Sequence, residues 1–121
     1  MKGSSRRPEQ VAETIRQVVA DALIRGEVRD PRVVGPVTVT RVDVTSDLSH
    51  ARIFVSAPGE EAERVGSIEG LRSAAGFLRS RVARVLTTRT VPELHIELDR
   101  GHEHAARINE LLEGIRREGE G

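Results

Sequence analysis

The chain has 121 residues, and its 19 Lys and Arg residues balance its 19 Asp and Glu residues, so the formal net charge is zero. This length fits one domain with a modest core. Two Phe and no Tyr or Trp exclude a wide platform for stacking bases, and the absence of Cys excludes disulfides and cysteine-ligated zinc. No apolar run approaches the about 20 residues that span a membrane, and residues 1–7 lack the apolar segment of a secretory signal. We therefore expect a cytoplasmic protein.

The charges are unevenly distributed along the chain. Residues 72–92 carry a net charge of +5 and no acidic residue, whereas residues 93–121 carry −4. A local field of this kind matters more for docking than the total charge does. The neutral total argues against a protein that coats nucleic acid indiscriminately.

The N-terminal quarter predicts an arm followed by a helix. Residues 1–7 are polar and basic, which is typical of a flexible arm. Pro8 suits the first position of a helix, and Gly26 suits its end. An apolar stripe at helical spacing between them predicts an amphipathic helix over residues 8–25: Val11, Ile15, Val18, Val19, Ala22 and Leu23.

Three β-branched or alternating segments predict strands. Residues 37–45 form the first, and their apolar positions change parity near Thr40 and Arg41, which indicates a β-bulge. A turn at residues 46–49 leads into the second strand at 51–56, so the pair should form an antiparallel hairpin. Residues 93–99 alternate cleanly and form the third strand.

Two helices should lie between the second and third strands, and one more should follow. Residues 60–73 and a segment from Gly76 to about Leu86 have helical periodicity, so we expect two helices that meet at an angle near residues 74–76. A last amphipathic helix is expected over residues 103–117, before a charged tail at 118–121. The predicted fold is therefore a single α+β domain, residues 8–117, in which helices pack on one face of a three-stranded mixed sheet. The order α-β-β-α-α-β resembles the second topology of the KH domain, an RNA-binding module.

The segment around the paired helices is the best candidate for a binding site. Ala74 and Ala75 are small enough to let another chain approach, and Gly76 leaves backbone N–H groups open near a helix start, where the dipole favours a phosphate. Arginine side chains surround them and suit bidentate contact with phosphates. The predicted RNA-binding set is Lys2, Arg6, Arg7, Arg72, Ala74, Ala75, Gly76, Arg79, Arg81, Arg84 and Arg89.

Enzyme chemistry finds no support in the sequence. His102 and His104 are two residues apart, so a helix would not place them on one face, and His95 has the parity of an exposed strand position. No nucleophile–base constellation or phosphate-binding loop motif is present. We expect no catalytic residue, metal, cofactor or small-molecule substrate. The alternative left open is a protein–protein adaptor that uses the acidic residues 93–121 and the exposed strand face to bind a basic partner.

Four segments resemble bacterial ribosome-binding factor A, in order and without a large gap over about residues 6–115. They are Asp47–Ser56, Ala74–Arg79, the run from Arg89 through Val91–Leu94 to Ile96 and Asp99, and Arg107–Ile108 with Leu111–Leu112. The Ala74-Ala75-Gly76 run resembles the Ala-x-Gly that this family carries in place of the Gly-x-x-Gly loop of KH domains.

The resemblance implies a non-enzymatic factor that binds the free small (30S) ribosomal subunit. It implies assistance in the late maturation and processing of 16S rRNA near its 5′ end, and departure before translation. Assembly GTPases and ribosomal proteins are further candidate partners. The short, charged chain is expected to be monomeric.

Overall fold

The computed structural model describes residues 2–101, with side chains from Arg7 onward. Its elements follow the predicted order: α1 (Lys2–Ile24), β1 (Thr38–Val44), β2 (His50–Ser56), α2 (Glu61–Ser73), α3 (Ala75–Val85) and β3 (Glu93–Leu98). The predicted α+β architecture is confirmed. The expected helix over residues 103–117 and the tail at 118–121 lie outside the described residues. Within residues 2–101, no helix is both long and apolar enough to cross a membrane.

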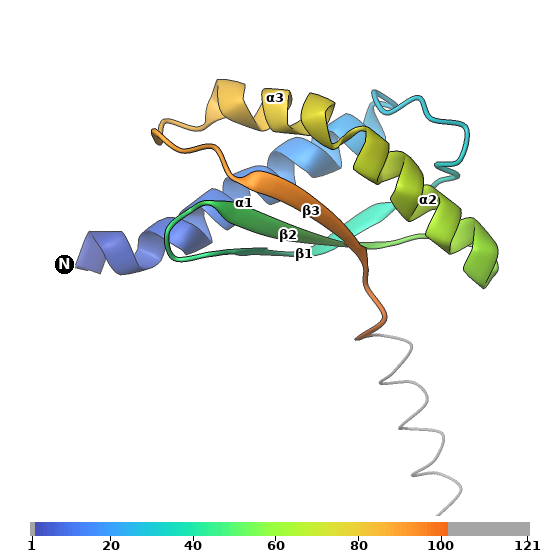
Figure 1. Cartoon of the computed structure of the whole chain (residues 1–121), viewed down its shortest axis with the longest axis horizontal. Coiled ribbons are helices and arrows are strands. Elements are labelled where there is room, and N and C mark those ends of the chain that lie inside the picture. Colours follow the sequence, from blue (N-terminus) through green and yellow to red (C-terminus); the bar gives the residue numbers. More distant parts are fainter. Residues whose placement is uncertain (1, 102–121) are drawn as a thin grey trace, which may run out of the picture.

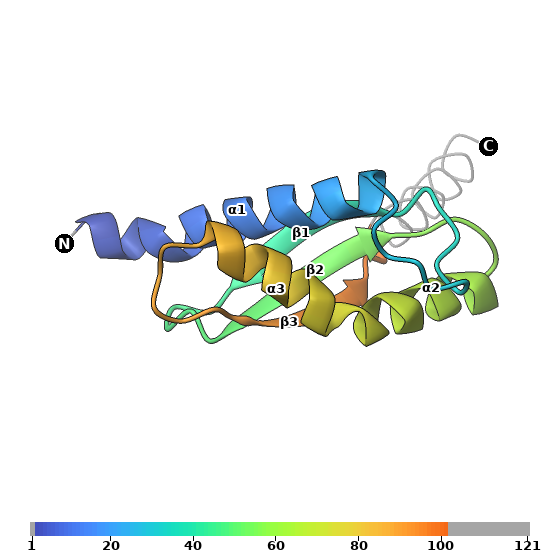
Figure 2. The ribbon, with the colours of Figure 1, turned by 90° about the horizontal axis from the view of Figure 1, so that it is seen from above.

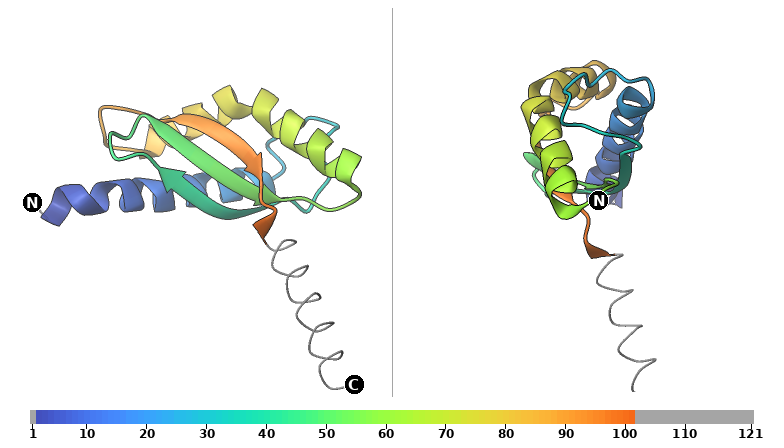
Figure 3. Two further views of the ribbon diagram at one scale, coloured as in Figure 1. Left: turned by 60° about the horizontal axis from the view of Figure 1, so that its bottom comes forward. Right: turned by 90° about the vertical axis from the view of Figure 1, so that its right-hand side faces the viewer.

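The sheet is mixed and covered on one side. Its strand order is β1-β2-β3, with β1 antiparallel to β2 and β2 parallel to β3. Figure 1 and the left view of Figure 3 show all three helices on one face of this sheet, while no other helix or strand of residues 2–101 covers the opposite face, which we call the open face. The register of β1 shifts between Val39 and Arg41, which confirms the predicted bulge.

The core lies between the helices and the face of the sheet that they cover. Side chains of the central strand β2, Ala51, Ile53 and Val55, have no exposed area. They pack with residues at helical spacing from each helix and with β3: Val11, Ile15, Val19, Ala22, Ile68, Leu71, Leu78, Val82, Leu94 and Ile96. Val85, which shares the apolar periodicity of α3, is instead 53% exposed. It is the last residue of α3, where the side chain lies at the rim between α3 and α1.

Helix α1 is longer than its sequence pattern predicts. It begins at Lys2 instead of Pro8, so residues 2–7, where we expected an arm without regular structure, continue the helix. Pro8 removes a single backbone hydrogen bond to the preceding turn, and α1 continues through that position. The other end agrees with the prediction: Gly26 has a φ of 68°, and its N–H donates to the Leu23 carbonyl at 3.1 Å.

Candidate RNA-binding surface

Helices α2 and α3 are separated by a single residue, Ala74. Its N–H donates to the Gly70 and Leu71 carbonyls of α2, at 3.2 and 3.0 Å, and its carbonyl accepts from Leu78 of α3 at 3.0 Å. No side chain caps the start of α3. Around Gly76, in the first turn of α3, the position that a Cβ would occupy has nothing within 4 Å. The predicted break is confirmed, and backbone here is open to close approach by another molecule.

Two of the predicted arginines hold the helices to the edge strand β3. Arg72 Nε donates to the Ile96 carbonyl at 2.9 Å. Arg79 donates to the carbonyls of Pro92 (Nε, 3.2 Å) and Val91 (Nη2, 2.8 Å) just before β3 begins. These bonds satisfy carbonyl groups at and just before β3, which pairs with no strand on its outer side within residues 2–101. Arg72 and Arg79 therefore have a structural role on this side of the helices.

The connection between α1 and β1 packs onto α2. The buried Ser67 hydroxyl donates to the Arg32 carbonyl at 3.3 Å and accepts from the Val34 N–H at 3.4 Å. Arg32 also donates to Ser73 Oγ at 3.0 Å and to Asp30 Oδ2 at 2.8 Å. The guanidinium and then the N–H of Arg32 lower the pKa of Asp30 to about 2. These contacts place residues 27–30, which precede Arg32 in the connection, beside the helix break at Ala74.

Gly70 lets this connection approach α2. A Cβ at position 70 would lie 2.6 Å from Val33 Cγ2 and 3.2 Å from Asp30 Cγ. The stiff valine and the hydrogen-bonded aspartate have little room to move, so Gly70→Ala should lower the free energy of unfolding by about 1 kcal/mol despite the better helix propensity of Ala. Urea unfolding measures this change.

Gly66, one turn earlier in α2, is the matched control. A Cβ there has nothing within 4 Å, so Gly66→Ala should raise the free energy of unfolding by about 0.5–1 kcal/mol. An equal stabilisation by both substitutions would contradict the packing role of Gly70.

Two hollows of about 330 Å³ each flank the helix break. The first lies against the edge strand and is lined by Arg72, Ala75 and β3 residues 94–97. The second lies against the α1–β1 connection and is lined by Arg29, Ala74 and Phe77 among others. Small residues therefore face an open groove on both sides of the break.

Arginines from the α1–β1 connection and from α3 lie around the second hollow and a further hollow that shares Glu27 with it. Arg81 donates to Glu27 Oε2 at 3.0 Å, and its guanidinium lies 5.3 Å from the centre of the Phe77 ring. Glu27 also lines a further hollow between α1 and α3, together with Arg25, Arg81 and Arg84. Arg25 pairs with Asp21 at 3.2 Å. We call Arg25, Arg29, Arg81 and Arg84 the arginine surface.

Arg29 and Arg84 are the cations of this surface that remain available. Both are exposed, and neither bonds to another residue in the described part of the chain. The acidic residues Asp21 and Glu27 are each paired with a different arginine. The surface thus offers two guanidinium groups that pair with no described residue, beside two that are held in place by ion pairs.

The sequence pattern of a known protein family extends over most of the chain. The pattern described as ribosome-binding factor A matches residues 7–112. The chain belongs to the ribosome-binding factor A family. It is 47% identical over 118 residues to ribosome-binding factor A of Rhodopirellula baltica, covering 98% of this chain and 85% of that protein. Identity to the Desulforamulus reducens protein of the same name is 47% over 111 residues, covering 92% and 91%.

Solved ribosome-binding factor A structures share the fold. A Thermotoga maritima structure described as a putative ribosome binding factor A is 32% identical, with a TM-score of 0.69, covering 78% of this chain and 89% of that one. A Thermus thermophilus homology model fitted into the cryo-EM map of a complex between the 30S subunit and ribosome-binding factor A is 27% identical, with a TM-score of 0.58, covering 71% and 88%.

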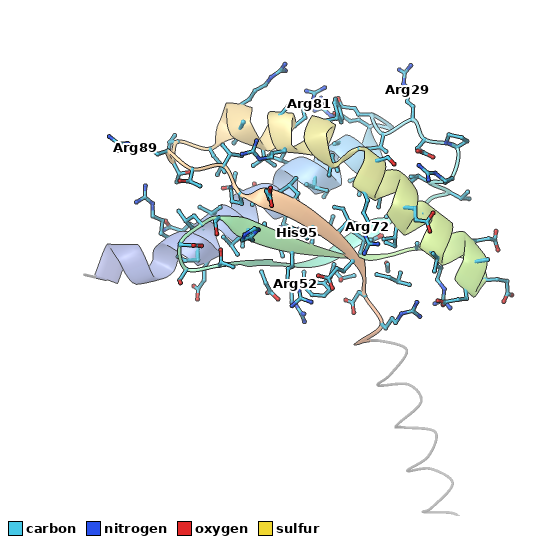
Figure 4. All side chains as sticks on the ribbon, viewed as in Figure 1. Arg29, Arg52, Arg72, Arg81, Arg89 and His95 are labelled. Atoms are coloured by element: carbon cyan, nitrogen blue, oxygen red, sulfur yellow. The ribbon has the colours of Figure 1, made fainter. Side chains whose placement is uncertain are left out.

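The ribosome-binding factor A fold divides the predicted site residues among separate places (Figure 4). Arg72 lies under α2 toward β3, whereas Arg81 and Arg29 both lie on the helical side of the sheet. Arg89, in the loop before β3, lies at the far end of the molecule, where α1 begins (Figures 1 and 2). Arg7 is exposed in α1, and the side chains of Lys2 and Arg6 lie outside the description.

Arg29 lines the second hollow, although it was not among the site residues predicted from the sequence. It lies between acidic residues in the segment Glu27-Val28-Arg29-Asp30, so its local charge pattern is unremarkable. Only the packing of the α1–β1 connection onto α2 brings it beside Ala74.

Proposed function

We propose that this protein is a non-enzymatic ribosome assembly factor that binds the free 30S subunit and assists late maturation of 16S rRNA near its 5′ region. The observation that carries the proposal is its membership of the ribosome-binding factor A family, one of whose members has been fitted into the map of a 30S complex. It acts in the cytoplasm as a monomer, with assembly GTPases and ribosomal proteins as further partners.

The helix break and the arginine surface are the proposed contact with rRNA. Arg29 and Arg84 bind phosphates, since two exposed guanidinium groups without partners in the described chain lose little on binding. The small residues Ala74 and Ala75 admit the sugar–phosphate chain to the groove. Recognition of this kind reads the shape of a folded RNA more than its bases.

Co-sedimentation with isolated ribosomal subunits tests the proposal. The purified chain is mixed with 30S or 50S subunits and centrifuged through sucrose at increasing salt. We expect co-sedimentation with 30S only, and a slope of log affinity against log salt of roughly −3 to −5 for four to six phosphate contacts. Chain that stays in the supernatant at low salt, or binds both subunits equally, would contradict the proposal. Salt-insensitive 30S binding would favour the protein–protein adaptor.

A further inference from the structure

The open face of the sheet carries a cluster of metal-ligating side chains far from the arginine surface. His50 begins β2, and Glu93 and His95 lie on β3. Figure 4 shows His95 and Arg52 on the opposite side of the sheet from Arg29 and Arg81. Because β2 and β3 are parallel and His50 pairs with Glu93, the three side chains emerge on the same face within one strand pair.

The three ligand atoms are already close to the geometry of a zinc site. His50 Nδ1 lies 3.0 Å from His95 Nε2, and Glu93 Oε2 lies 3.5 Å from His50 Nδ1 and 3.8 Å from His95 Nε2. Tetrahedral zinc with ligands at 2.0–2.1 Å places the ligand atoms about 3.3–3.4 Å apart. The triangle seen here brackets that spacing. A metal ion reaches it easily, since all three residues are exposed.

Neighbouring charges leave the cluster free to accept a cation. The neighbouring basic residue on β2 is Arg52, whose partner in the strand register is His95. Its guanidinium is directed to the Glu97 carboxylate, at 2.6 and 2.9 Å. The cluster itself contributes one carboxylate and two imidazoles, a donor set that suits Zn²⁺ and other late divalent transition metals and does not suit Mg²⁺.

We propose that His50, Glu93 and His95 form a binding site for a divalent transition-metal ion, Zn²⁺ in the first instance, on the open face of the sheet. Three protein ligands leave the fourth tetrahedral position to water or to an oxygen or nitrogen ligand from outside the chain. From the sequence we expected no metal, because His102 and His104 are two residues apart and His95 has the parity of an exposed strand position. The cluster instead joins His95 to His50, 45 residues away. His95 also lines the first hollow beside the helix break, but zinc binding by the chain alone is tested without the 30S subunit.

Calorimetric titration of the full, untagged chain with ZnCl₂ at neutral pH tests the site. We expect saturable one-to-one binding, no binding of MgCl₂, and ¹⁵N shifts at His50 Nδ1 and His95 Nε2 in the imidazole NMR spectrum. His50→Gln and His95→Gln should each weaken zinc binding at least tenfold, and Glu93→Gln should weaken it less. Amide NMR spectra of the variants establish that each is folded.

The chain contains four histidines, so His102→Gln with His104→Gln is the matched control. This double variant removes the two histidines outside the cluster, one more than either single variant removes, and its zinc affinity should stay within about twofold of the original. The proposal fails if the original chain shows no saturable binding, if His50→Gln binds zinc unchanged, or if the His102→Gln, His104→Gln variant loses the binding.

Discussion

Reversing the two available arginines, Arg29→Glu with Arg84→Glu, should lower the affinity for the 30S subunit by about 100-fold at moderate salt. Each arginine that contacts a phosphate releases a counterion, so the slope of log affinity against log salt should also become shallower by about 2. The substitutions should leave the fold intact, because neither side chain bonds to another described residue. Salt-dependent co-sedimentation gives both quantities. Arg84 lies in the last turn of α3, where a negative charge costs about 0.3–1 kcal/mol of stability.

The open sheet face supplies a control of equal charge. Arg41→Glu with Arg52→Glu changes the net charge by the same amount and breaks exposed ion pairs with Asp43 and Glu97, which contribute little to stability. This variant should bind 30S subunits within about threefold of the original. If both double variants lose the same affinity, the binding depends on overall charge, and the arginine surface is not the contact.

Periodicity was sufficient to predict the elements, because each one buries a regular stripe. Ile53 and Val55 alternate inward on β2, and Leu78 and Val82 lie one turn apart on α3, all with no exposed area. The parity change at Thr40 and Arg41 predicted the bulge for the same reason: the side chains on each side of it still face the core. Local pattern and burial agree here, so the sequence is informative.

The direction in which each arginine side chain points could not be predicted, because its hydrogen-bond partners are distant in sequence. Arg72 and Arg79 are seven residues apart and bond to carbonyls of β3 and of the residues before it, 24 and 12–13 positions away. Arg81 bonds to Glu27, 54 positions away. The net charge of the segment 72–92 counts all of these arginines equally. Tertiary packing separates those that bond to backbone carbonyls from those that face solvent.

The same limitation applies to the α1–β1 connection and to the histidine cluster. Residues 25–37 lack periodicity, so nothing in the segment predicted that Ser67 and Gly70 of α2 would hold it in place. Likewise the His50–His95 contact depends on the parallel pairing of β2 with β3, which brings together residues 45 positions apart. Both features are properties of the assembled fold and not of any single segment.

Replacing Arg79 by Ala should lower the free energy of unfolding by about 2–3 kcal/mol. The substitution removes two charge-assisted hydrogen bonds, and the Pro92 carbonyl belongs to a fully buried residue at the entry to β3. A carbonyl left without a donor in such a position costs about 1–3 kcal/mol. Urea unfolding followed by far-UV circular dichroism measures the change. Arg79→Lys should recover only part of the loss, since a single ammonium cannot reproduce the fork that reaches both carbonyls.

Arg84→Ala is the matched control, in the same helix and with the same truncation. It should change the free energy of unfolding by no more than about 0.5 kcal/mol, because no bond to a described residue is lost. The order of the two variants should be reversed for 30S affinity, measured at a temperature where both are folded. Arg84→Ala should weaken 30S binding, and Arg79→Ala should leave it nearly unchanged. A stable Arg79→Ala protein with weakened 30S binding would instead assign Arg79 to the rRNA contact, and its bonds to the edge strand would then be incidental to folding.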